Sequence, residues 1–386
     1  MLFDFKEEKK PLEDYTNFYL TPHEWYTINR DHTKEEVIAH LNLLKKDLPF
    51  PTRVFSDEEI KKDFKDLKRS KINIRKDKWE SHRLLSEMEY TYKGEYLYFD
   101  SYFEGLKIGR KFSDSVRMKC RHKERLSPVT CWEKSEGKFT FFRTFYSILK
   151  DEIGKGGITD KSLLRALKMH EYQASQFKPA MAKMFYNFFN AENVLDFSAG
   201  WGDRLIGFHA SDSHSYIGID PHTEMHDPYR EITNFCNTGK RSDFICLPSE
   251  EVDYSKLKYD FVFTSPPYFN TELYSYEETQ SWMRYKAIGD WLEGFLFKTL
   301  GEIYEHLPQG GRIAVNISDI ISSKAEICKP LRVYMKGLGA TYEGVVGYKM
   351  SKRNGVDYGD QIFCEPVFIW TKGEGKEPRW KEKTFF

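Results

Sequence analysis

The sequence has no closely spaced cysteine pair and no long uninterrupted hydrophobic run. Its six cysteines are scattered over 386 residues, which indicates reduced thiols rather than a disulfide framework. A membrane-spanning helix needs about 20 successive apolar residues, so we predict none. The N-terminus also lacks the basic and apolar regions of a signal peptide. We therefore expect a soluble, intracellular protein, with cytoplasm and nucleoid or nucleus equally compatible.

The sequence also has no net charge, because 59 basic residues balance 59 acidic ones. The balance is uneven, since residues 61–150 hold 23 Lys and Arg against 13 Asp and Glu. Such a basic block can bind phosphates, although a solvated Lys-rich surface is an equally good interpretation. With 40% hydrophobic residues, the chain can bury a sizeable core and does not have the composition of a disordered protein.

The residue pattern changes near residue 150. Before it, capping boxes at Thr33 and Ser56 predict two helix starts, and residues 90–98 predict a hairpin around Lys-Gly. Residues 154–157, Gly-Lys-Gly-Gly, are typical of a flexible joint. We therefore predict two domains, a basic, aromatic-rich α+β domain over residues 1–157 and a second domain over residues 158–386.

Strands alternate with helices in the second domain, which predicts an α/β fold with a mostly parallel sheet. Two strand-like runs close the chain and predict an antiparallel pair at the sheet edge, joined by a short polar loop. The expected strands cover residues 194–196, 216–220, 244–247, 261–263, 312–317, 341–350 and 362–370. The expected helices cover residues 177–189, 203–210 and 291–307.

Two prolines end the fourth of these strands, in the run Thr264-Ser265-Pro266-Pro267-Tyr268. Proline donates no hydrogen bond to a strand ladder, so the chain must turn outward at the strand's carboxyl end. Ligands of open α/β sheets bind at that edge. A hydroxyl, carbonyls fixed by proline and an aromatic ring suit a flat, hydrogen-bonding substrate such as a nucleobase.

A second candidate site follows the first strand, where the run from Asp196 to Gly202, D-F-S-A-G-W-G, leads into a helix. Glycines at alternate positions allow a tight turn and close approach of a ligand to the backbone. Asp220 ends the next strand, where an acidic side chain can bind ribose hydroxyls. The glycine pair together with Asp220 predicts an adenosine-containing cofactor. The full dinucleotide fingerprint is not met, because its third glycine is missing.

Together these motifs resemble those of AdoMet-dependent amino-methyltransferases of the N4-cytosine/N6-adenine DNA methyltransferase family. The similarity spans roughly residues 170–372, and the S-P-P-Y form resembles the N4-cytosine branch more than the N6-adenine branch. The resemblance implies a class I AdoMet-methyltransferase (Rossmann-like) fold with S-adenosyl-L-methionine as cofactor. It also implies methyl transfer to an exocyclic amine in DNA, with cytosine N4 the first target and the base flipped out or single-stranded.

The resemblance further implies roles for individual residues. Ser265 would hydrogen-bond the target amine with the Pro266 carbonyl as second acceptor, and Tyr268 would stack on the base. Asp196 would lie near the amino group of the methionine moiety, and Asp220 would bind the ribose. The implied catalytic residues are Ser265, Pro266, Pro267 and Tyr268. The implied cofactor-binding residues are Phe177, Lys178, Pro179, Asp196, Ser198, Gly200, Gly202, Asp220, Ser249, Glu250 and Thr264.

Alternatives stay open for the substrate and for its recognition. The chain could instead be an N6-adenine DNA methyltransferase, an RNA base amino-methyltransferase or a catalytically silent nucleic-acid-binding partner. Residues 61–150 are one candidate for target recognition. The segment 270–291 is another, or else a packed lid, with Tyr274, Tyr276, Gln280, Trp282 and Arg284 as its notable residues. We expect no metal, because two clusters match no familiar ligand spacing: Cys120, His122 and Cys131, and His209, His214, His222 and His226.

Overall fold

The computed structural model describes residues 9–100, 103–123, 125–134, 146, 156–170, 173–350, 361–375 and 377–378. By its contacts the chain divides into two compact units. The first unit comprises Met1–Val54 and Arg117–Ala174, and the second comprises Phe55–Val116 and Ser175–Phe386. This division differs from the expected boundary at residue 157, because residues 55–116 belong to the same unit as the C-terminal half. The basic block is therefore shared between two units.

The first unit is helical in its described residues. Its elements are η1 (Leu12–Asp14), α1 (Pro22–Asp31), α2 (Lys34–Lys45), α5 (Pro128–Glu133) and α7 (Asp160–His170). The capping box predicted at Thr33 is present, since Thr33 accepts the Glu36 N–H and the Glu36 carboxylate accepts the Thr33 N–H at 2.8 Å. Buried aromatic residues such as Trp25 and Trp132 form its core.

The second unit is built on a nine-stranded sheet in the order β1-β2-β8-β9-β7-β6-β3-β4-β5. Neighbours from β7 to β5 are parallel, whereas β9 is antiparallel to both β7 and β8. The predicted α/β fold class, a Rossmann-like and mostly parallel sheet with an antiparallel pair, is confirmed. The strands are β1 (Ile74–Lys76), β2 (Leu97–Phe99), β3 (Asn193–Asp196), β4 (Ser215–Ile219), β5 (Arg241–Ile245), β6 (Phe261–Thr264), β7 (Arg312–Asn316), β8 (Thr341–Lys349) and β9 (Cys364–Thr371).

The sequence predicts the antiparallel pair at the edge of the sheet, and this position is wrong. Strand β2 pairs with β8 in parallel and β1 continues beyond it, so strands expected in a separate N-terminal α+β domain extend this sheet. The predicted hairpin is reduced to a tight turn. Lys93 and Gly94 have positive φ values of 48° and 83°, and one bridge joins Tyr92 to Glu95 while Tyr92 also bridges Gly344. The loop expected between β8 and β9 lies outside the described residues.

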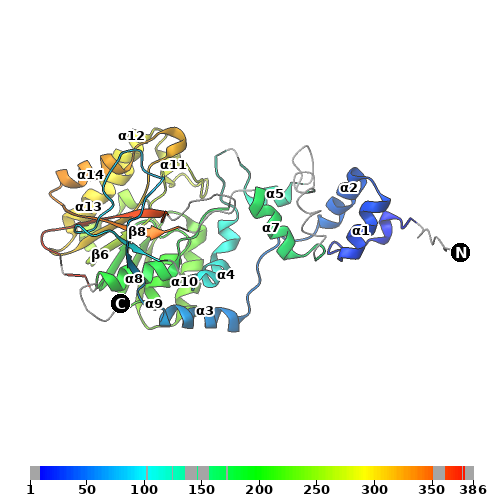
Figure 1. The fold of residues 1–386 in the computed structure, drawn as a ribbon, viewed down its shortest axis with the longest axis horizontal. Helices are drawn as coiled ribbons and strands as arrows, with labels where there is room; N and C mark the ends of the chain where they lie inside the picture. The colour runs from blue at the N-terminus through cyan, green and yellow to red at the C-terminus, as the bar shows by residue number, and fades with distance from the viewer. Residues whose placement is uncertain are drawn as a thin grey trace. The chain divides into compact units, whose positions relative to one another are not determined.

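Helices cover both faces of the sheet (Figure 1). On one face lie α8 (Pro179–Phe188), α9 (Asp203–Ala210) and α10 (His226–Cys236), and on the other α12 (Ile288–Trp291), α13 (Lys298–His306) and α14 (Cys328–Gly337). The helix expected over residues 291–307 is interrupted by a π-helical stretch, Leu292–Phe297. The remaining helical elements are α3 (Asp57–Arg69), α4 (Leu106–Arg117), η2 (Thr223–Met225), η3 (Ser249–Glu251), η4 (Tyr254–Lys256), α11 (Ser281–Arg284) and η6 (Ile321–Ser323).

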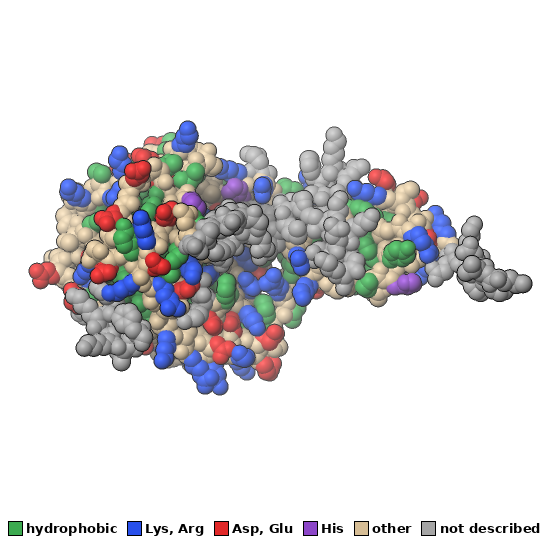
Figure 2. Space-filling model, viewed as in Figure 1, with side chains coloured by type: hydrophobic (Ala, Val, Ile, Leu, Met, Phe, Trp, Pro, Cys, Tyr) green, Lys and Arg blue, Asp and Glu red, His purple; other side chains and the backbone are tan. Residues whose placement is uncertain are grey.

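Segment 55–116 is anchored to the C-terminal part of this unit by polar contacts as well as by strand pairing. Lys183 on α8 donates to the Leu67, Lys68 and Ser70 carbonyls at 2.8, 2.8 and 2.6 Å, so it binds the end of α3. On the face shown in Figure 2, basic and acidic side chains are interspersed. None of the helices in the described ranges is long and apolar enough to cross a membrane.

Candidate active site

The candidate site lies along the carboxyl edge of the parallel strands. Strands β3 and β6 are neighbours, with Leu195 opposite Val262, so the glycine loop after β3 and the S-P-P-Y turn after β6 leave the sheet side by side. Asp220 follows β4, the other neighbour of β3. The fold therefore brings together at one edge the two halves of the site that were predicted from separate motifs.

The glycine loop depends on two left-handed backbone conformations. Gly200 and Gly202 have φ values of 58° and 78°, which residues with a Cβ rarely adopt. Gly202 is also the N-cap of α9, and a Cβ there would lie 2.7 Å from Cδ1 of Ile232. The loop is held to the sheet by the Ala199 N–H, which donates to the Ile219 carbonyl at 2.9 Å.

Asp220 holds the glycine loop from the next strand. Its carboxylate accepts the Gly200 N–H at 2.8 Å and the His222 N–H at 3.0 Å. Burial raises the pKa of Asp220, and both histidines beside it, His222 and His226, oppose that rise. A carboxylate has about four acceptor positions, so two of them are still available for hydroxyl donors. The predicted ribose role of Asp220 is compatible with this geometry.

Asp196 is fully buried and bound by protein groups. Arg204 Nε lies 2.7 Å from Asp196 Oδ2, and the Tyr216 hydroxyl donates to the same oxygen at 2.8 Å. Arg204 also donates to the Ser198 carbonyl, so the ion pair fixes the start of the glycine loop. A direct contact between Asp196 and a cofactor amino group would require Arg204 to move. Ser198 remains partly exposed beside this pair.

The loop after β5 is tied to the same region. Ser249 is buried and its hydroxyl donates to the Phe197 carbonyl, while the Tyr254 hydroxyl donates to the Ser249 carbonyl at 2.9 Å. Burial raises the pKa of Glu250, which is paired with Arg284 at 2.9 Å. The bond to Phe197 places Ser249 beside the glycine loop, whereas Glu250 contacts Arg284 in the segment after the S-P-P-Y turn.

The segment 176–179 lies at the start of α8, with Lys178 as N-cap and Pro179 in the first turn. Lys178 is buried, and its Nζ has no hydrogen-bond acceptor in the part of the chain that the structure describes. The ammonium lies 4.6 Å from the Phe103 ring centre and 5.6 Å from that of Tyr348. Burial lowers the pKa of Lys178 to about 8. Phe177 packs edge-on against Phe263 on β6, with ring centres 5.6 Å apart.

Helix α4 lies at the end of segment 55–116 and packs directly on the glycine loop. Ser113 Oγ donates to the Trp201 carbonyl at 2.7 Å. A Cβ at Gly109 would lie 2.4 Å from Asp203 Oδ1, so α4 approaches α9 closely. No sequence motif indicates this contribution. The helical spacing of apolar residues over 106–117 predicts a helix, but it does not predict which element that helix packs against.

The Ser265–Tyr268 turn begins where β6 ends. Thr264 is fully buried, and its hydroxyl has no partner among the described residues, so it points into the protein rather than to solvent. Ser265 and Tyr268 are partly exposed, and Pro266 is buried. Burial raises the pKa of Tyr268. Ser318, which follows β7, has a buried hydroxyl without a hydrogen-bond partner among the described residues.

The segment after this turn crosses toward the loops that follow β4 and β5. The Glu277 carboxylate accepts the Thr223 N–H at 3.1 Å and the Thr223 hydroxyl, while Arg284 pairs with Glu250 and Glu251. Tyr274 packs edge-on against Trp201 at 5.5 Å. Of the five candidate target-contact residues, Tyr276 and Arg284 are exposed, Tyr276 at 56%. These contacts support the alternative interpretation, a packed lid.

The candidate metal clusters are not assembled. Burial lowers the pKa of His209 to about 3, and its Nδ1 lies 2.8 Å from the Thr238 hydroxyl. His226 Nε2 lies 2.8 Å from the Asp220 carbonyl. In the described part of the chain, the one cluster with metal-ligand proximity is Glu302, Glu305 and His306 on α13, and none of the predicted cysteines or histidines belongs to it.

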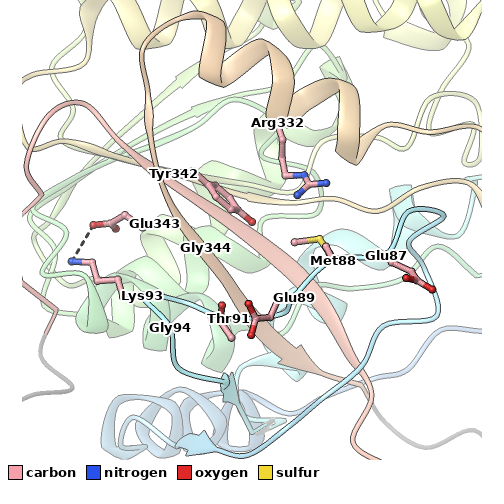
Figure 3. Close-up of a pocket in the computed structure, with 10 residues that line it drawn as sticks. All are labelled: Glu87, Met88, Glu89, Thr91, Lys93, Gly94, Arg332, Tyr342, Glu343 and Gly344. Atoms are coloured by element: carbon pink, nitrogen blue, oxygen red, sulfur yellow. Dashed lines mark ion pairs between the residues drawn. The ribbon is translucent and has the colours of Figure 1, made fainter.

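A hollow of about 390 Å³ lies elsewhere, around the start of β8 (Figure 3). Because β8 runs parallel to β7, its start lies at the amino edge of the sheet, opposite to the candidate site. Glu343 in this hollow is already paired with Lys93 at 3.2 Å and with Arg312 at 2.9 Å. The hollow is therefore separate from the site predicted from sequence.

No family model matches this sequence, and no curated protein matches it either. Solved structures with a similar fold include TrmN from Thermus thermophilus, at 16% identity and a TM-score of 0.34, covering 50% of this chain and 48% of that one. An rRNA methylase from Streptococcus thermophilus has 14% identity and a TM-score of 0.33, covering 52% of this chain and 100% of that one. Precorrin-6y C5,15-methyltransferase from Geobacter metallireducens has 13% identity and a TM-score of 0.33, covering 50% and 86%. The chain thus spans about half the length of TrmN, and at these identities the likeness concerns the fold alone.

Proposed function

We propose that this chain transfers a methyl group from S-adenosyl-L-methionine to an exocyclic amine of a nucleobase in DNA, with cytosine N4 as the first target. The observation that carries the proposal is the adjacency of β3 and β6. Neighbouring strands lie about 4.8 Å apart, so a cofactor on the glycine loop and a base at Ser265–Tyr268 would be within reach of one another.

The residues on the cofactor side suit an adenosine-containing ligand. At Gly200 the backbone leaves room that a side chain would fill, since a Cβ there would meet no atom closer than 3.7 Å. Two of the roughly four acceptor positions of the Asp220 carboxylate are taken by N–H groups, so the others would serve the ribose hydroxyls. When bound, S-adenosyl-L-methionine supplies a methyl group on a positively charged sulfur. Phe177, Lys178 and Pro179 at the start of α8 would border the methionine part, as the resemblance implies.

On the substrate side, the turn supplies two acceptors for one amine. An exocyclic amine is a poor nucleophile because its lone pair is delocalised into the ring. Hydrogen bonds to the Ser265 hydroxyl and the Pro266 carbonyl would favour the tetrahedral form of the nitrogen and expose its lone pair. Positioning of this kind supplies much of the rate of a transfer reaction. Serine is a weak base, so water would take the released proton.

A base inside a duplex cannot reach such a turn, so the target would be flipped out or single-stranded. The decisive experiment measures transfer of a tritiated methyl group to duplex DNA, single-stranded DNA and RNA. Digestion of the product to nucleosides then separates N4-methylcytosine from N6-methyladenine. Transfer to RNA alone would favour an RNA base methyltransferase. No transfer to any nucleic acid, together with no binding of the cofactor, would overturn the enzyme assignment and leave a silent binding partner.

A further inference from the structure

Arg83, in the segment between β1 and β2, is an electrostatic neighbour of the proposed catalytic turn. Its Nη1 lies 3.1 Å from Glu365 Oε1. Glu365 stands near the start of β9, opposite Tyr348 at the carboxyl end of β8. Strand β9 begins beside the end of β7, with Val367 opposite Asn316, and β7 ends beside β6, with Val315 opposite Thr264. The ion pair therefore lies at the same edge of the sheet as the turn after β6. Besides burial, which raises the pKa of Tyr268 most, Glu365 raises it and Arg83 lowers it.

The backbone around Arg83 is fixed on both sides. The Asp319 N–H donates to the Arg83 carbonyl at 2.8 Å, and the Asp319 carboxylate accepts the Leu85 N–H at 2.8 Å. Before Arg83, the Glu80 N–H donates to the Ile362 carbonyl, and the Cys364 N–H donates to the Glu80 carbonyl, both at 2.9 Å. Because Asp319 follows β7, these bonds hold Arg83 where β7 ends and β9 begins.

The Arg83 guanidinium has donors to spare. Its side chain is 38% exposed, whereas that of Glu365 is 13% exposed. A guanidinium carries five N–H donors in a fixed fork. Within the described ranges, the Glu365 carboxylate is the acceptor bound to it, so the solvent-facing donors are available to a ligand at the turn.

We propose that Arg83 is a specificity-determining residue of the target-base site, and that it binds the ring edge next to the exocyclic amine. The proposal rests on the function proposed above. In cytosine the amine is followed around the ring by N3 and O2, which are both acceptors. In adenine it is followed by N1 and then by a C–H. A forked donor matches two successive acceptors, so Arg83 would favour cytosine, and Glu365 would orient the guanidinium.

The test combines substitutions in the protein with a change in the base. The first substrate is a single-stranded oligonucleotide with one cytosine. The second carries a 2-aminopyridine C-nucleoside instead, which keeps the amine and the adjacent ring nitrogen but lacks the 2-oxo group. We expect the full-length wild-type chain to prefer cytosine in kcat/KM by roughly 10- to 100-fold, the range of one charge-assisted hydrogen bond. Arg83→Met should lower transfer to cytosine and abolish the preference, and Arg83→Lys should retain part of it.

Arg75→Met is the matched control, because Arg75 is an exposed arginine on β1 in the same segment, and its preference should equal that of the wild type. An unchanged preference in Arg83→Met, with methyl transfer intact, would overturn the role of Arg83 and leave the proposed function standing. If the wild type binds cofactor but methylates no nucleic acid, the proposed function fails instead.

In that case, the binding of the two oligonucleotides, measured by fluorescence anisotropy, decides whether Arg83 recognises the cytosine ring edge. Loss of the cytosine preference in Arg83→Met supports the proposal, and equal preferences in both proteins overturn it.

Discussion

Arg204 and Asp196 form a buried ion pair at the base of the glycine loop, with 2.7 Å between Nε and Oδ2 and with side chains 6% and 0% exposed. The Tyr216 hydroxyl donates to the same carboxylate oxygen. Removing one partner of such a pair leaves an uncompensated buried charge, which costs far more than the pair itself contributes. The pair, with the bond from Arg204 to the Ser198 carbonyl, therefore fixes the start of the loop.

We expect Arg204→Met to lower the free energy of unfolding by about 3–5 kcal/mol, because the Asp196 carboxylate would stay buried without its cation. Urea unfolding measures this free energy. The relevant transition is the one that S-adenosyl-L-methionine shifts to higher urea, because the ligand stabilises the unit that binds it. Arg230→Met is the matched control, since Arg230 and Asp227 form an exposed pair with side chains 64% and 86% exposed, and it should cost less than about 1 kcal/mol. Adding Asp196→Asn to Arg204→Met should recover part of the loss. Equal effects of Arg204→Met and Arg230→Met would contradict this account.

Ser265→Ala separates the two halves of the site. The variant loses one of the two acceptors proposed for the target amine, so we expect kcat to fall by roughly 10- to 100-fold. Cofactor affinity, measured by calorimetry, should be unchanged because Ser265 lies in the turn after β6 and not in the glycine loop. Ser255→Ala, at an exposed serine on η4, should keep full activity. A loss of cofactor affinity in Ser265→Ala would show that Ser265 belongs to the cofactor half instead.

Much of the C-terminal fold could be predicted because its signals are local. A capping residue and its partner three positions later, as at Ser56 and Glu59, are confirmed because both groups belong to the same turn of chain. The helix expected over residues 203–210 is confirmed in full, since the glycines before it and the polar residues after it mark both ends. Strand β5 begins earlier than expected, at Arg241, because its first residues are polar and carry no hydrophobic alternation.

The parts that the sequence did not reveal depend on contacts between distant residues. Ser113 meets Trp201, 88 positions away, and Arg83 meets Glu365 at the far end of the chain. No periodicity or spacing encodes such a partner. For the same reason the sequence leaves two interpretations of the segment after Tyr268, target contact and packed lid. Its position directly after the proposed catalytic turn favours target contact, whereas the contacts of Glu277 and Arg284 with the loops after β4 and β5 favour the lid.

Glu277 tests the lid interpretation. Glu277→Ala removes the two hydrogen bonds to Thr223, so the segment should open more readily and the Kd for S-adenosyl-L-methionine should rise about 3- to 10-fold. The change should lie mainly in the dissociation rate, which stopped-flow fluorescence measures. Glu278→Ala is the matched control, because Glu278 is its exposed neighbour. If the segment contacts the target instead, Glu277→Ala would raise KM for the oligonucleotide and leave the cofactor Kd unchanged.

Lys178 gives the protein a pH-dependent stability. Burial lowers the pKa of its ammonium from 10.5 to about 8, so between these values the folded state binds fewer protons than the unfolded state. Stability due to this group therefore rises with pH across that window, and below it the buried charge is destabilising.

Lys178→Met keeps an unbranched chain beside Phe103 and Tyr348 without the charge. We expect the variant to be more stable than the wild type at pH 7, with the difference shrinking as pH rises from about 8 toward 10.5. Urea unfolding of both proteins across this range measures the difference, and Lys258→Met, at an exposed lysine, should show a constant one. A difference for Lys178→Met that does not vary with pH would mean that the Lys178 side chain is solvated in the folded protein.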